Sequence, residues 1–566
     1  MASSARPPLR VPVGRDAERW RTFQGTRTVA VAARTVTSTV RLLETLPAVV
    51  RGDSRVTVVF AYDSTSAFSA GVLDLLKDAG CRILPWTQLA DVSPDLLISA
   101  SENIDVPPGD WPVLVLPHGI GFQKMVPDSR AEGVRLSGLV PDTLLDSGRA
   151  WLAVSHPDQE KQLITARPET AGRTVLIGDP VLDELRASAS HARVYREALG
   201  LARGQRLVVL SSTWGPTSLL GRDPGLPARL LAALPYDGYR LAAVIHPNVW
   251  AGHGAWQIRT LLADAMDAGL LLMPPVNTWR TALVAADFVI GDHGSVTLYG
   301  AALGKPILLG AFGSDAVPGT AMARLGRAAP RLDPRADVRR QVEAALDTHT
   351  PDRFADIVAG AFSRPGHALA RLRTTVYGLL GLSEPGWTPP PVLSLPRPDP
   401  PVAEVTSWLV RTSVEFADGR PVVTAHRCPS AVSDGESSDE APGEFIHLAA
   451  DDHERDARVS ESSSVLLRRR PAPTSVAALR WIREVLDRCP GSYLAGTAVA
   501  GAGYLVGIRD GRVVEVSTTG PALDAGLPAS LVYTCLRGRI PLDATVTLRA
   551  DGVPETDAVL RLRTRG

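Results

Sequence analysis

Short apolar runs rich in β-branched residues alternate with amphipathic stretches along most of this chain. TVAVAA (28–33) has the composition of a buried strand, and RVTVVFAYD (55–63) has the same character. Between them, VTSTVRLLETLPAVV (36–50) has an apolar residue every three or four positions, which is typical of a helix packed on a core. Strands that are apolar nearly throughout are expected where helices cover both faces of a sheet. The alternation therefore predicts βαβ units and parallel sheets.

The length of 566 residues exceeds what one hydrophobic core usually supports. We expect a Rossmann-like domain over 1–150 and a second one over 151–384, where a second series of strands and helices runs. A proline-rich stretch over 385–401 predicts a semi-rigid linker. Residues 402–566 differ in character and predict a small α+β domain, with a disordered acidic tract at about 430–445. The expected fold class is α/β, with two tandem Rossmann-like domains and a small α+β domain.

Charge and cysteine content exclude several classes of protein. Lys and Arg number 60 and Asp and Glu also number 60, so nothing in the balance indicates nucleic acid as a partner. Four cysteines stand in no metal-ligand spacing, and the sequence therefore predicts no zinc site and no disulfide framework. We also expect no cofactor. Neither a signal peptide nor a membrane span is evident, so we expect a cytoplasmic protein.

Three histidines stand where a predicted buried strand ends. They are His118 in VLVLPHG, His246 in LAAVIHPN and His293 in DFVIGDHGS. Open α/β sheets bind their ligands at the carboxyl ends of their strands. The pattern therefore indicates a site for chemistry at these positions.

The segment from Asp292 to Ser295 predicts an anion site. A predicted strand is followed here directly by a predicted helix, so free backbone N–H groups and the positive helix end meet at this loop. Gly294 would let a phosphate approach the backbone closely, and Ser295 can add a hydroxyl donor. The alternative is that Asp292 or Ser295 only caps the helix.

His246 and His118 each have two interpretations. His246 is followed by a proline that ends its strand; as a cation it could pair with a phosphate, and as a neutral ring it could donate one N–H. His118, with Gly119 behind it leaving room for a substrate, suits a general base because an unperturbed imidazole titrates near working pH. Either histidine could instead be structural, with His118 hydrogen-bonded to a neighbouring loop.

These motifs together resemble the CDP-glycerol glycerophosphotransferase family of teichoic acid polymerases, which belongs to the GT-B glycosyltransferase-like group. The resemblance rests on the strand-end His-Gly, the His-Pro, the Asp-x-x-Ser before a helix, Leu-Gly-Lys-Pro (303–306) and GDPVLDEL (178–185). It covers about residues 28–380. Leu-Gly-Lys-Pro and the helix before it recur across many GT-B enzymes, so these two motifs are less specific than the others.

The resemblance implies a role for each matching residue. His118 would deprotonate the acceptor hydroxyl, with Gly119 and Lys124 also on the acceptor side. His246, Asp292, His293, Gly294 and Ser295 would bind the donor's pyrophosphate. Thr213 and Trp214 would form a donor-side loop, in which Trp214 either stacks on a nucleobase or packs at a domain interface. Asn277 would contact the base or, more simply, cap the helix that it begins.

The chain departs from the family pattern at two places. After His-Gly the family usually has Thr-Pro and a lysine soon after, whereas this chain continues Ile120-Gly121-Phe122-Gln123-Lys124. Where the family usually has an aromatic residue and two serines, this chain has His293-Gly294-Ser295, so one hydroxyl is replaced by an imidazole. The first departure concerns the acceptor and the second concerns the identity of the donor.

The expected function is transfer of a glycerophosphate-, polyol-phosphate- or sugar-type group from a nucleotide-activated donor to a hydroxyl acceptor, in cell-envelope polymer biosynthesis. CDP-glycerol and a nucleotide sugar are the candidate donors. By the resemblance, the acceptor can be lipid-linked and the protein can contact the inner face of the cell membrane peripherally. Two alternatives stay open: an enzyme resembling UDP-sugar 2-epimerases, and a degenerate GT-B module that binds nucleotide or glycan without turnover. The sequence does not indicate an oligomeric state.

Overall fold

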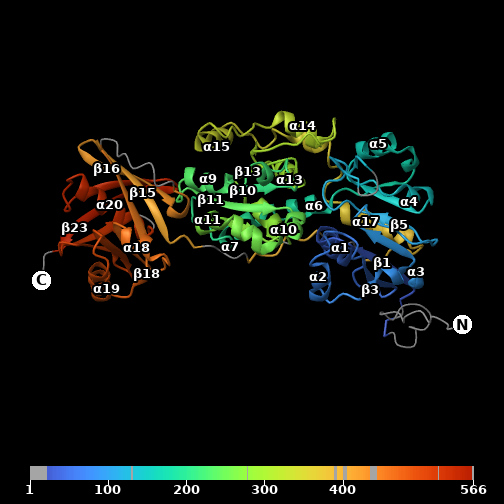
Figure 1. Cartoon of the computed structure of the whole chain (residues 1–566), viewed down its shortest axis with the longest axis horizontal. Helices are drawn as coiled ribbons and strands as arrows, with labels where there is room; N and C mark the ends of the chain where they lie inside the picture. Colours follow the sequence, from blue (N-terminus) through green and yellow to red (C-terminus); the bar gives the residue numbers. More distant parts are fainter. Residues whose placement is uncertain are drawn as a thin grey trace.

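The structure is a computed structural model, and it describes residues 22–23, 25–128, 132–276, 278–387, 392–399, 404–433, 443–519 and 522–563. Parts of several predictions from the sequence fall beyond these ranges. Residues 388–391 and 400–401 of the predicted linker and 434–442 of the predicted acidic tract lie outside the described residues. Three bodies follow one another along the long axis of the molecule (Figure 1).

The first body contains a parallel seven-stranded sheet in the order β3-β2-β1-β4-β5-β8-β9. Its central strands are fully buried because helices cover both faces, as their apolar sequences predict. Its strands are β1 (Arg27–Ala33), β2 (Val56–Tyr62), β3 (Ile83–Pro85), β4 (Leu96–Ser99), β5 (Val113–Val115), β8 (Ala150–Val154) and β9 (Thr174–Leu176). A short antiparallel ribbon, β6 (Met125–Pro127) with β7 (Val134–Leu136), follows β5.

The first domain extends further along the chain than the sequence predicts. Strands β8 and β9 hydrogen-bond to its sheet, so the sheet ends at Leu176 rather than before residue 150. A helix from the end of the second domain, α17, also returns to pack on this sheet through Leu372 and Val376. The helices around this sheet are α1 (Val36–Val49), α2 (Val72–Asp78), α3 (Leu89–Val92), α4 (Asp142–Asp146), α5 (Pro157–Ala166) and α17 (Ala368–Leu379).

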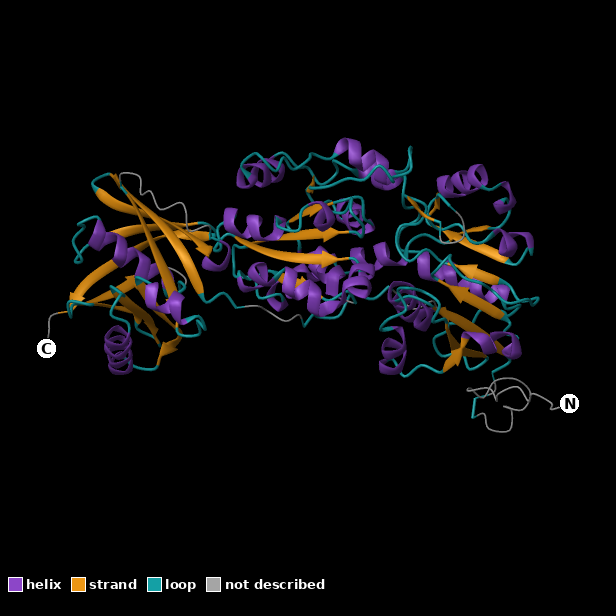
Figure 2. Cartoon of the chain, viewed as in Figure 1, coloured by secondary structure: helices purple, strands orange, loops and turns teal. Residues whose placement is uncertain are grey.

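The second body contains a parallel five-stranded sheet in the order β12-β11-β10-β13-β14. Its strands are β10 (Arg206–Ser212), β11 (Tyr239–Ile245), β12 (Leu271–Met273), β13 (Phe288–Gly291) and β14 (Ile307–Leu309). Its helices are α6 (Pro180–Ala187), α7 (Ala192–Ala198), α8 (Leu219–Arg222), α9 (Leu226–Ala233), α10 (Pro247–Leu261), α11 (Ala263–Asp267), α12 (Thr278–Ala285), α13 (Ser295–Ala302), α14 (Ala321–Ala328), α15 (Val338–Asp347) and α16 (Ala355–Ala359). Figure 2 shows helices on both faces of this sheet.

Both sheets have the strand order of a doubly wound nucleotide-binding fold, in which the chain starts in the middle and reverses direction once. The reversal lies between β1 and β4 in the first sheet and between β10 and β13 in the second. Such switch points are where open α/β sheets bind ligands. The prediction of two tandem Rossmann-like domains is therefore confirmed.

The third body is a closed β-barrel, so the prediction of a small α+β domain is wrong. Residues 407–563 form a closed barrel of nine strands in the order β15-β16-β22-β23-β21-β20-β19-β18-β17, and its interior is filled by α20. The strands are β15 (Ser407–Ala417), β16 (Arg420–Pro429), β17 (Glu444–Asp451), β18 (Val465–Ala472), β19 (Leu494–Val499), β20 (Gly503–Ile508), β21 (Val513–Thr518), β22 (Thr545–Ala550) and β23 (Val553–Arg563). The helices are α18 (Ala457–Ser462), α19 (Ser475–Arg488) and α20 (Gly526–Arg537).

The barrel is fixed to the second domain by a buried arginine. Arg427 of β16 donates two hydrogen bonds to Asp237, of 2.9 and 2.6 Å, and also bonds to Asp524. Its guanidinium lies over the rings of Tyr236 and Trp408. Because Asp237 precedes β11, this contact lies at the amino ends of the second sheet, away from the carboxyl ends that bind ligands.

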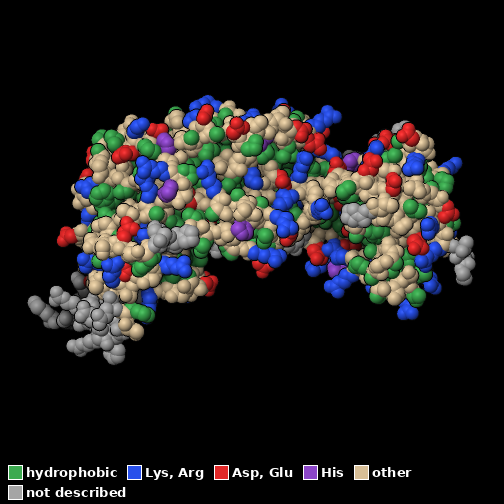
Figure 3. Space-filling view, turned by 180° about the vertical axis from the view of Figure 1, so that it is seen from behind, with side chains coloured by type: hydrophobic (Ala, Val, Ile, Leu, Met, Phe, Trp, Pro, Cys, Tyr) green, Lys and Arg blue, Asp and Glu red, His purple; other side chains and the backbone are tan. Residues whose placement is uncertain are grey.

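The surface and the helices show two further features. On the face shown in Figure 3, basic and acidic side chains are interspersed, in keeping with the balanced charge of the sequence. Among the described residues, no helix combines the length and apolar character needed to cross a lipid bilayer.

Candidate functional site

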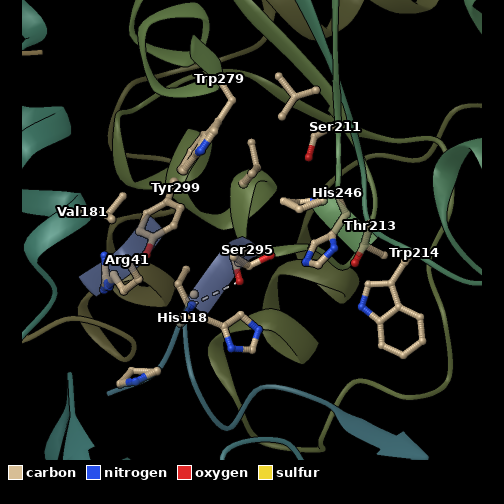
Figure 4. Close-up of a pocket in the computed structure, with 18 of the residues that line it drawn as sticks. Arg41, His118, Val181, Ser211, Thr213, Trp214, His246, Trp279, Ser295 and Tyr299 are labelled. Carbon is tan, nitrogen blue, oxygen red and sulfur yellow. Dashed lines mark hydrogen bonds between the residues drawn. The ribbon is translucent and has the colours of Figure 1, made fainter. Parts of the chain in front are cut away.

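A cleft between the two Rossmann-like domains collects most of the predicted site residues. It is lined by residues that follow β1, β4 and β5 in the first sheet and β10, β11, β12 and β13 in the second. Its empty volume, which includes open solvent at its mouth, is about 1440 Å³. Figure 4 shows side chains from both domains pointing into this space. The predicted residues lining it are His118, Gly119, Lys124, Thr213, Trp214, His246, His293, Gly294 and Ser295.

Of two further predicted residues, one lies behind the cleft wall and the other falls outside the described part of the chain. Asn277 lies outside the described residues. Asp292 is completely buried behind the cleft wall, where its carboxylate accepts hydrogen bonds from the backbone N–H groups of Thr213 and Leu219, each 2.8 Å, and of Gly294, 2.9 Å. Burial raises the pKa of Asp292, against the opposing effect of these hydrogen bonds. Its place is therefore that of a structural tie between the loops after β10 and β13, and not of a phosphate ligand.

The N-terminus of α13 is open to the cleft. Its N-cap is Gly294, and no side chain caps the helix, so the alternative that Asp292 or Ser295 only caps it is not what the structure has. The first N–H groups of a helix have no partners within it and carry partial positive charge. The hydroxyl of Ser295 accepts a hydrogen bond of 3.2 Å from the backbone N–H of Ile120 in the first domain. Its proton remains available to a ligand oxygen.

Gly119 lies close to Ser295 across the cleft. A Cβ atom on Gly119 would lie 2.9 Å from Oγ of Ser295, closer than real Cβ atoms approach other atoms. The lack of a side chain at Gly119 therefore accommodates Ser295 of the second domain, and not only a substrate.

His246 is a neutral imidazole whose orientation is fixed. It precedes α10, and its Nδ1 accepts a hydrogen bond of 3.1 Å from the backbone N–H of Asn248. The ring proton of the neutral form must then be on Nε2. Burial, together with the nearby charges of His118 and Lys124, lowers the pKa of His246 to about 3. Of the two sequence interpretations, the neutral N–H donor is the one that the structure favours.

The side chain of His293 contacts groups of its own domain. Its Nδ1 accepts a hydrogen bond of 3.1 Å from the backbone N–H of Gly313, and its Nε2 lies 3.1 Å from the carboxylate of Asp315. Burial alone would raise the pKa of Asp315, but the contact with His293 and the charge of Lys124 lower it below its ordinary value. Nδ1 of His293 is thus hydrogen-bonded within the protein, while Nε2 is buried beside Asp315 and makes no hydrogen bond among the described residues.

Lys124 crosses from the first domain to the donor-side loop of the second. Its Nζ lies 3.4 Å from Oγ1 of Thr213 and 4.8 Å from the ring centroid of Trp214. A backbone bridge from Lys124 to Ala316 fixes this crossing. Burial lowers the pKa of Lys124, although Asp315 and Asp292 oppose the shift. From the resemblance, Lys124 was expected on the acceptor side. In the structure its ammonium lies between the two domains and covers one face of the Trp214 ring.

His118 is the most accessible of the three strand-end histidines, and a carboxylate lies near it. Glu102, which follows β4, lines the same cleft and accepts a hydrogen bond of 3.3 Å from the backbone N–H of Gly138. Burial would raise the pKa of Glu102, but the charges of His118 and Arg135 lower it overall. Sequence reasoning missed Glu102. Its position after the strand next to that of His118 is the signal that could have found it.

An ionic network beside the cleft was also missed. Arg280 of α12 is buried and hydrogen-bonds to Glu44 of the first domain and to Glu184 of α6. Burial raises the pKa of both glutamates. Each of these residues lies on an amphipathic helix, where the sequence alone does not distinguish it from a solvent-exposed charge.

A scan against protein-family models finds no match for the chain, and a search of the curated proteins finds none either. Three solved structures illustrate what its structure resembles. The wall teichoic acid polymerase TagF with CDPG is 12% identical over 63% of this chain and 89% of that chain, with a TM-score of 0.43. UDP-GlcNAc 2-epimerase from Neisseria meningitidis is 12% identical over 62% and 100%, with a TM-score of 0.42. A glycosyltransferase from Rickettsia africae is 10% identical over 63% and 99%, with a TM-score of 0.37.

Teichoic acid polymerases, the group named from the sequence motifs, are thus among the structures that this chain matches. The epimerase alternative is matched to the same degree. At this identity the matches do not identify the reaction.

Proposed function

We propose that the protein transfers a glycerophosphate-, polyol-phosphate- or sugar-type group from a nucleotide-activated donor to a hydroxyl acceptor. One observation carries the proposal: an accessible histidine of the first domain, a neutral histidine of the second domain and an open helix N-terminus line one cleft. A group-transfer reaction needs a base on one reactant and anion stabilisation on the other. The cleft offers these two functions from opposite walls.

In this proposal His118 is the general base. It takes the proton from the acceptor hydroxyl as the oxygen attacks the donor, and the bond to the nucleotide phosphate breaks. The carboxylate of Glu102 stabilises the imidazolium that forms, as a carboxylate does beside other catalytic histidines. Its lowered pKa keeps it ionised for this purpose.

The second domain stabilises the leaving nucleotide. Nε2–H of His246 donates to a phosphate oxygen, and the first N–H groups of α13 with the hydroxyl of Ser295 meet the developing negative charge. The ammonium of Lys124 adds a positive charge from the first domain. Because the pKa of His246 is lowered to about 3, its ring stays neutral near pH 7 and donates this hydrogen bond as a fixed dipole.

Nucleotide release from candidate donors tests this function. The purified chain is incubated with CDP-glycerol, CDP-ribitol or UDP-GlcNAc, with and without a polyol-phosphate acceptor that is free or lipid-linked. His118→Ala should slow acceptor-dependent release by roughly 10²–10⁴-fold, the usual contribution of a general base. His253→Ala removes an exposed histidine of α10 and is the control. A His118→Ala rate equal to wild type removes the assigned base, and binding of nucleotide without turnover in wild type indicates a degenerate module.

Epimerisation of a UDP-sugar is the second candidate, favoured by Glu102. Such a reaction needs a carboxylate near the sugar to move a proton, and Glu102 supplies one on the first-domain wall. The two candidates differ in their products. An epimerase incorporates solvent deuterium at the sugar carbon and needs no acceptor, whereas the transferase releases nucleotide only when an acceptor hydroxyl is present.

A further inference from the structure

Arg41 is a buried cation whose hydrogen-bonding capacity is unused. It lies in the second turn of α1, its exposed fraction is 4%, and it lines the cleft. A guanidinium carries five N–H donors. Among the described residues Arg41 makes one ion contact, of 3.7 Å from Nη2 to the carboxylate of Asp179, and its Nη1 is buried with no hydrogen-bond partner. Leaving such donors unpaired away from water is costly, so the position calls for a partner that the chain does not supply.

The nearby carboxylates are already committed to other groups. Asp179 accepts hydrogen bonds from the backbone N–H of Leu182, 3.0 Å, and from the hydroxyl of Tyr299, 2.8 Å. Glu44, one turn further along α1, is held by Arg280. Desolvation by burial is opposed by the charge of Asp179, and the pKa of Arg41 is raised overall. Arg41 therefore remains a full positive charge with unpaired donors.

A second unpaired group lies one helical turn before Arg41. Thr37 also lines the cleft, and its Oγ1 is buried without a hydrogen-bond partner among the described residues. Residues four apart on a helix lie on the same face, so the hydroxyl and the guanidinium project from neighbouring places on α1. Figure 4 shows Arg41 in the pocket, beside Tyr299 and Val181.

We propose that Arg41 and Thr37 form a phosphate-binding subsite on the first-domain wall of the cleft. A guanidinium binds two phosphate oxygens in its fork geometry, and the threonine hydroxyl supplies one further donor. This deepens the proposed function and rests on it only in that one of the two reactants carries the phosphate. That phosphate belongs either to the donor nucleotide or to the acceptor, and both sources place the same oxyanion on the same donors.

Equilibrium binding of phosphate-bearing probes tests the subsite without requiring turnover. Calorimetric titrations with CDP, UDP, cytidine and uridine, and with glycerol 3-phosphate after saturation with CDP or UDP, compare wild type with Arg41→Gln, Arg41→Lys and Thr37→Val. Arg51→Gln, just beyond the C-terminal end of the same helix and exposed, is the control. If the donor supplies the phosphate, Arg41→Gln weakens CDP or UDP binding by roughly 10- to 100-fold and leaves nucleoside binding unchanged. If the acceptor supplies it, the same loss is seen only for glycerol 3-phosphate.

The variants also separate binding from folding. Arg41→Lys keeps the charge but not the fork and should retain part of the affinity, and Thr37→Val keeps the shape and should weaken binding several-fold. Should Arg41→Gln fail to fold, as judged by thermal unfolding, Thr37→Val and Arg41→Lys carry the test. Unchanged affinity for every phosphate probe in folded variants overturns the subsite. Loss of phosphate affinity in a protein that catalyses no transfer would support the subsite and count against the proposed function.

Discussion

Lowering the pH is expected to destabilise the second domain through His246. The pKa of this side chain is lowered from 6.5 to about 3 by burial and by the charges of His118 and Lys124. Below about pH 6.5 the unfolded chain takes up a proton at His246 that the folded chain does not. The stabilising contribution is therefore complete above the unfolded pKa and is lost progressively as the pH falls towards the folded pKa.

The size of the effect follows from the two pKa values. Between about pH 7 and about pH 5, the difference in proton binding corresponds to a loss of about 2 kcal/mol in the free energy of unfolding. His246 is half-buried at the wall of an open cleft, so water reaching the ring makes this an upper value. His447, which is buried in the barrel with its pKa also lowered to about 3, should produce a loss of the same sign there.

Urea unfolding followed by hydrogen exchange and mass spectrometry can assign each loss to its own domain. His246→Asn keeps an acceptor for the backbone N–H of Asn248, because asparagine is a good N-cap, but it cannot titrate. Peptides from α10 should therefore lose about 2 kcal/mol less on acidification in this variant than in wild type. His447→Asn should change the barrel peptides and not those of α10. Equal acid sensitivity of α10 in wild type and His246→Asn would show that His246 is not held neutral, and the proposed N–H donor would lose its basis.

Three further variants test the contacts around the cleft and the barrel. Asp292→Ala leaves three backbone N–H groups without an acceptor and should cost at least about 3 kcal/mol in urea unfolding, whereas Asp292→Asn, which keeps one oxygen, should cost less. Gly119→Ala should displace the hydroxyl of Ser295 and cost about 1–3 kcal/mol in urea unfolding, and adding Ser295→Gly should relieve the overlap. Arg427→Met leaves Asp237 and Asp524 without their cation and should cost about 3–5 kcal/mol, with limited proteolysis releasing the barrel; an intact digestion pattern would contradict this.

The parallel sheets could be predicted from the sequence because the evidence for them is local. A continuously apolar strand such as β5 and the histidine that ends it, His118, stand next to each other in the chain. The same holds for His246 and His293, and all three line the cleft as expected. The occupation of His293 could not be foreseen, because Gly313 and Asp315 approach it through a loop that begins after another strand.

The barrel could not be predicted, because its closure depends on pairings between distant strands. β16 pairs in parallel with β22, more than a hundred residues later, and no local pattern records this. Helix α20 is hard to predict for another reason, since a helix that is buried all round has no polar face to show its periodicity. The ionic network of Arg280 and the burial of Arg41 were missed for a related reason. Glu44 and Glu184, which bind Arg280, and Asp179, which lies near Arg41, come from other parts of the chain.

Both junctions between the three bodies depend on a buried arginine. Arg427 holds the barrel at the amino ends of the second sheet through Asp237, while Figure 1 places the first domain at the opposite end of the molecule. At the cleft, Arg280 of the second domain hydrogen-bonds to Glu44 of the first domain, beside the polar contacts of Ile120 with Ser295 and of Lys124 with Thr213. Water can replace the latter contacts at small net cost, whereas a buried ion pair is costly to break. Separating the first two domains therefore has to break the Arg280–Glu44 pair, as separating the barrel has to break the Arg427–Asp237 pair.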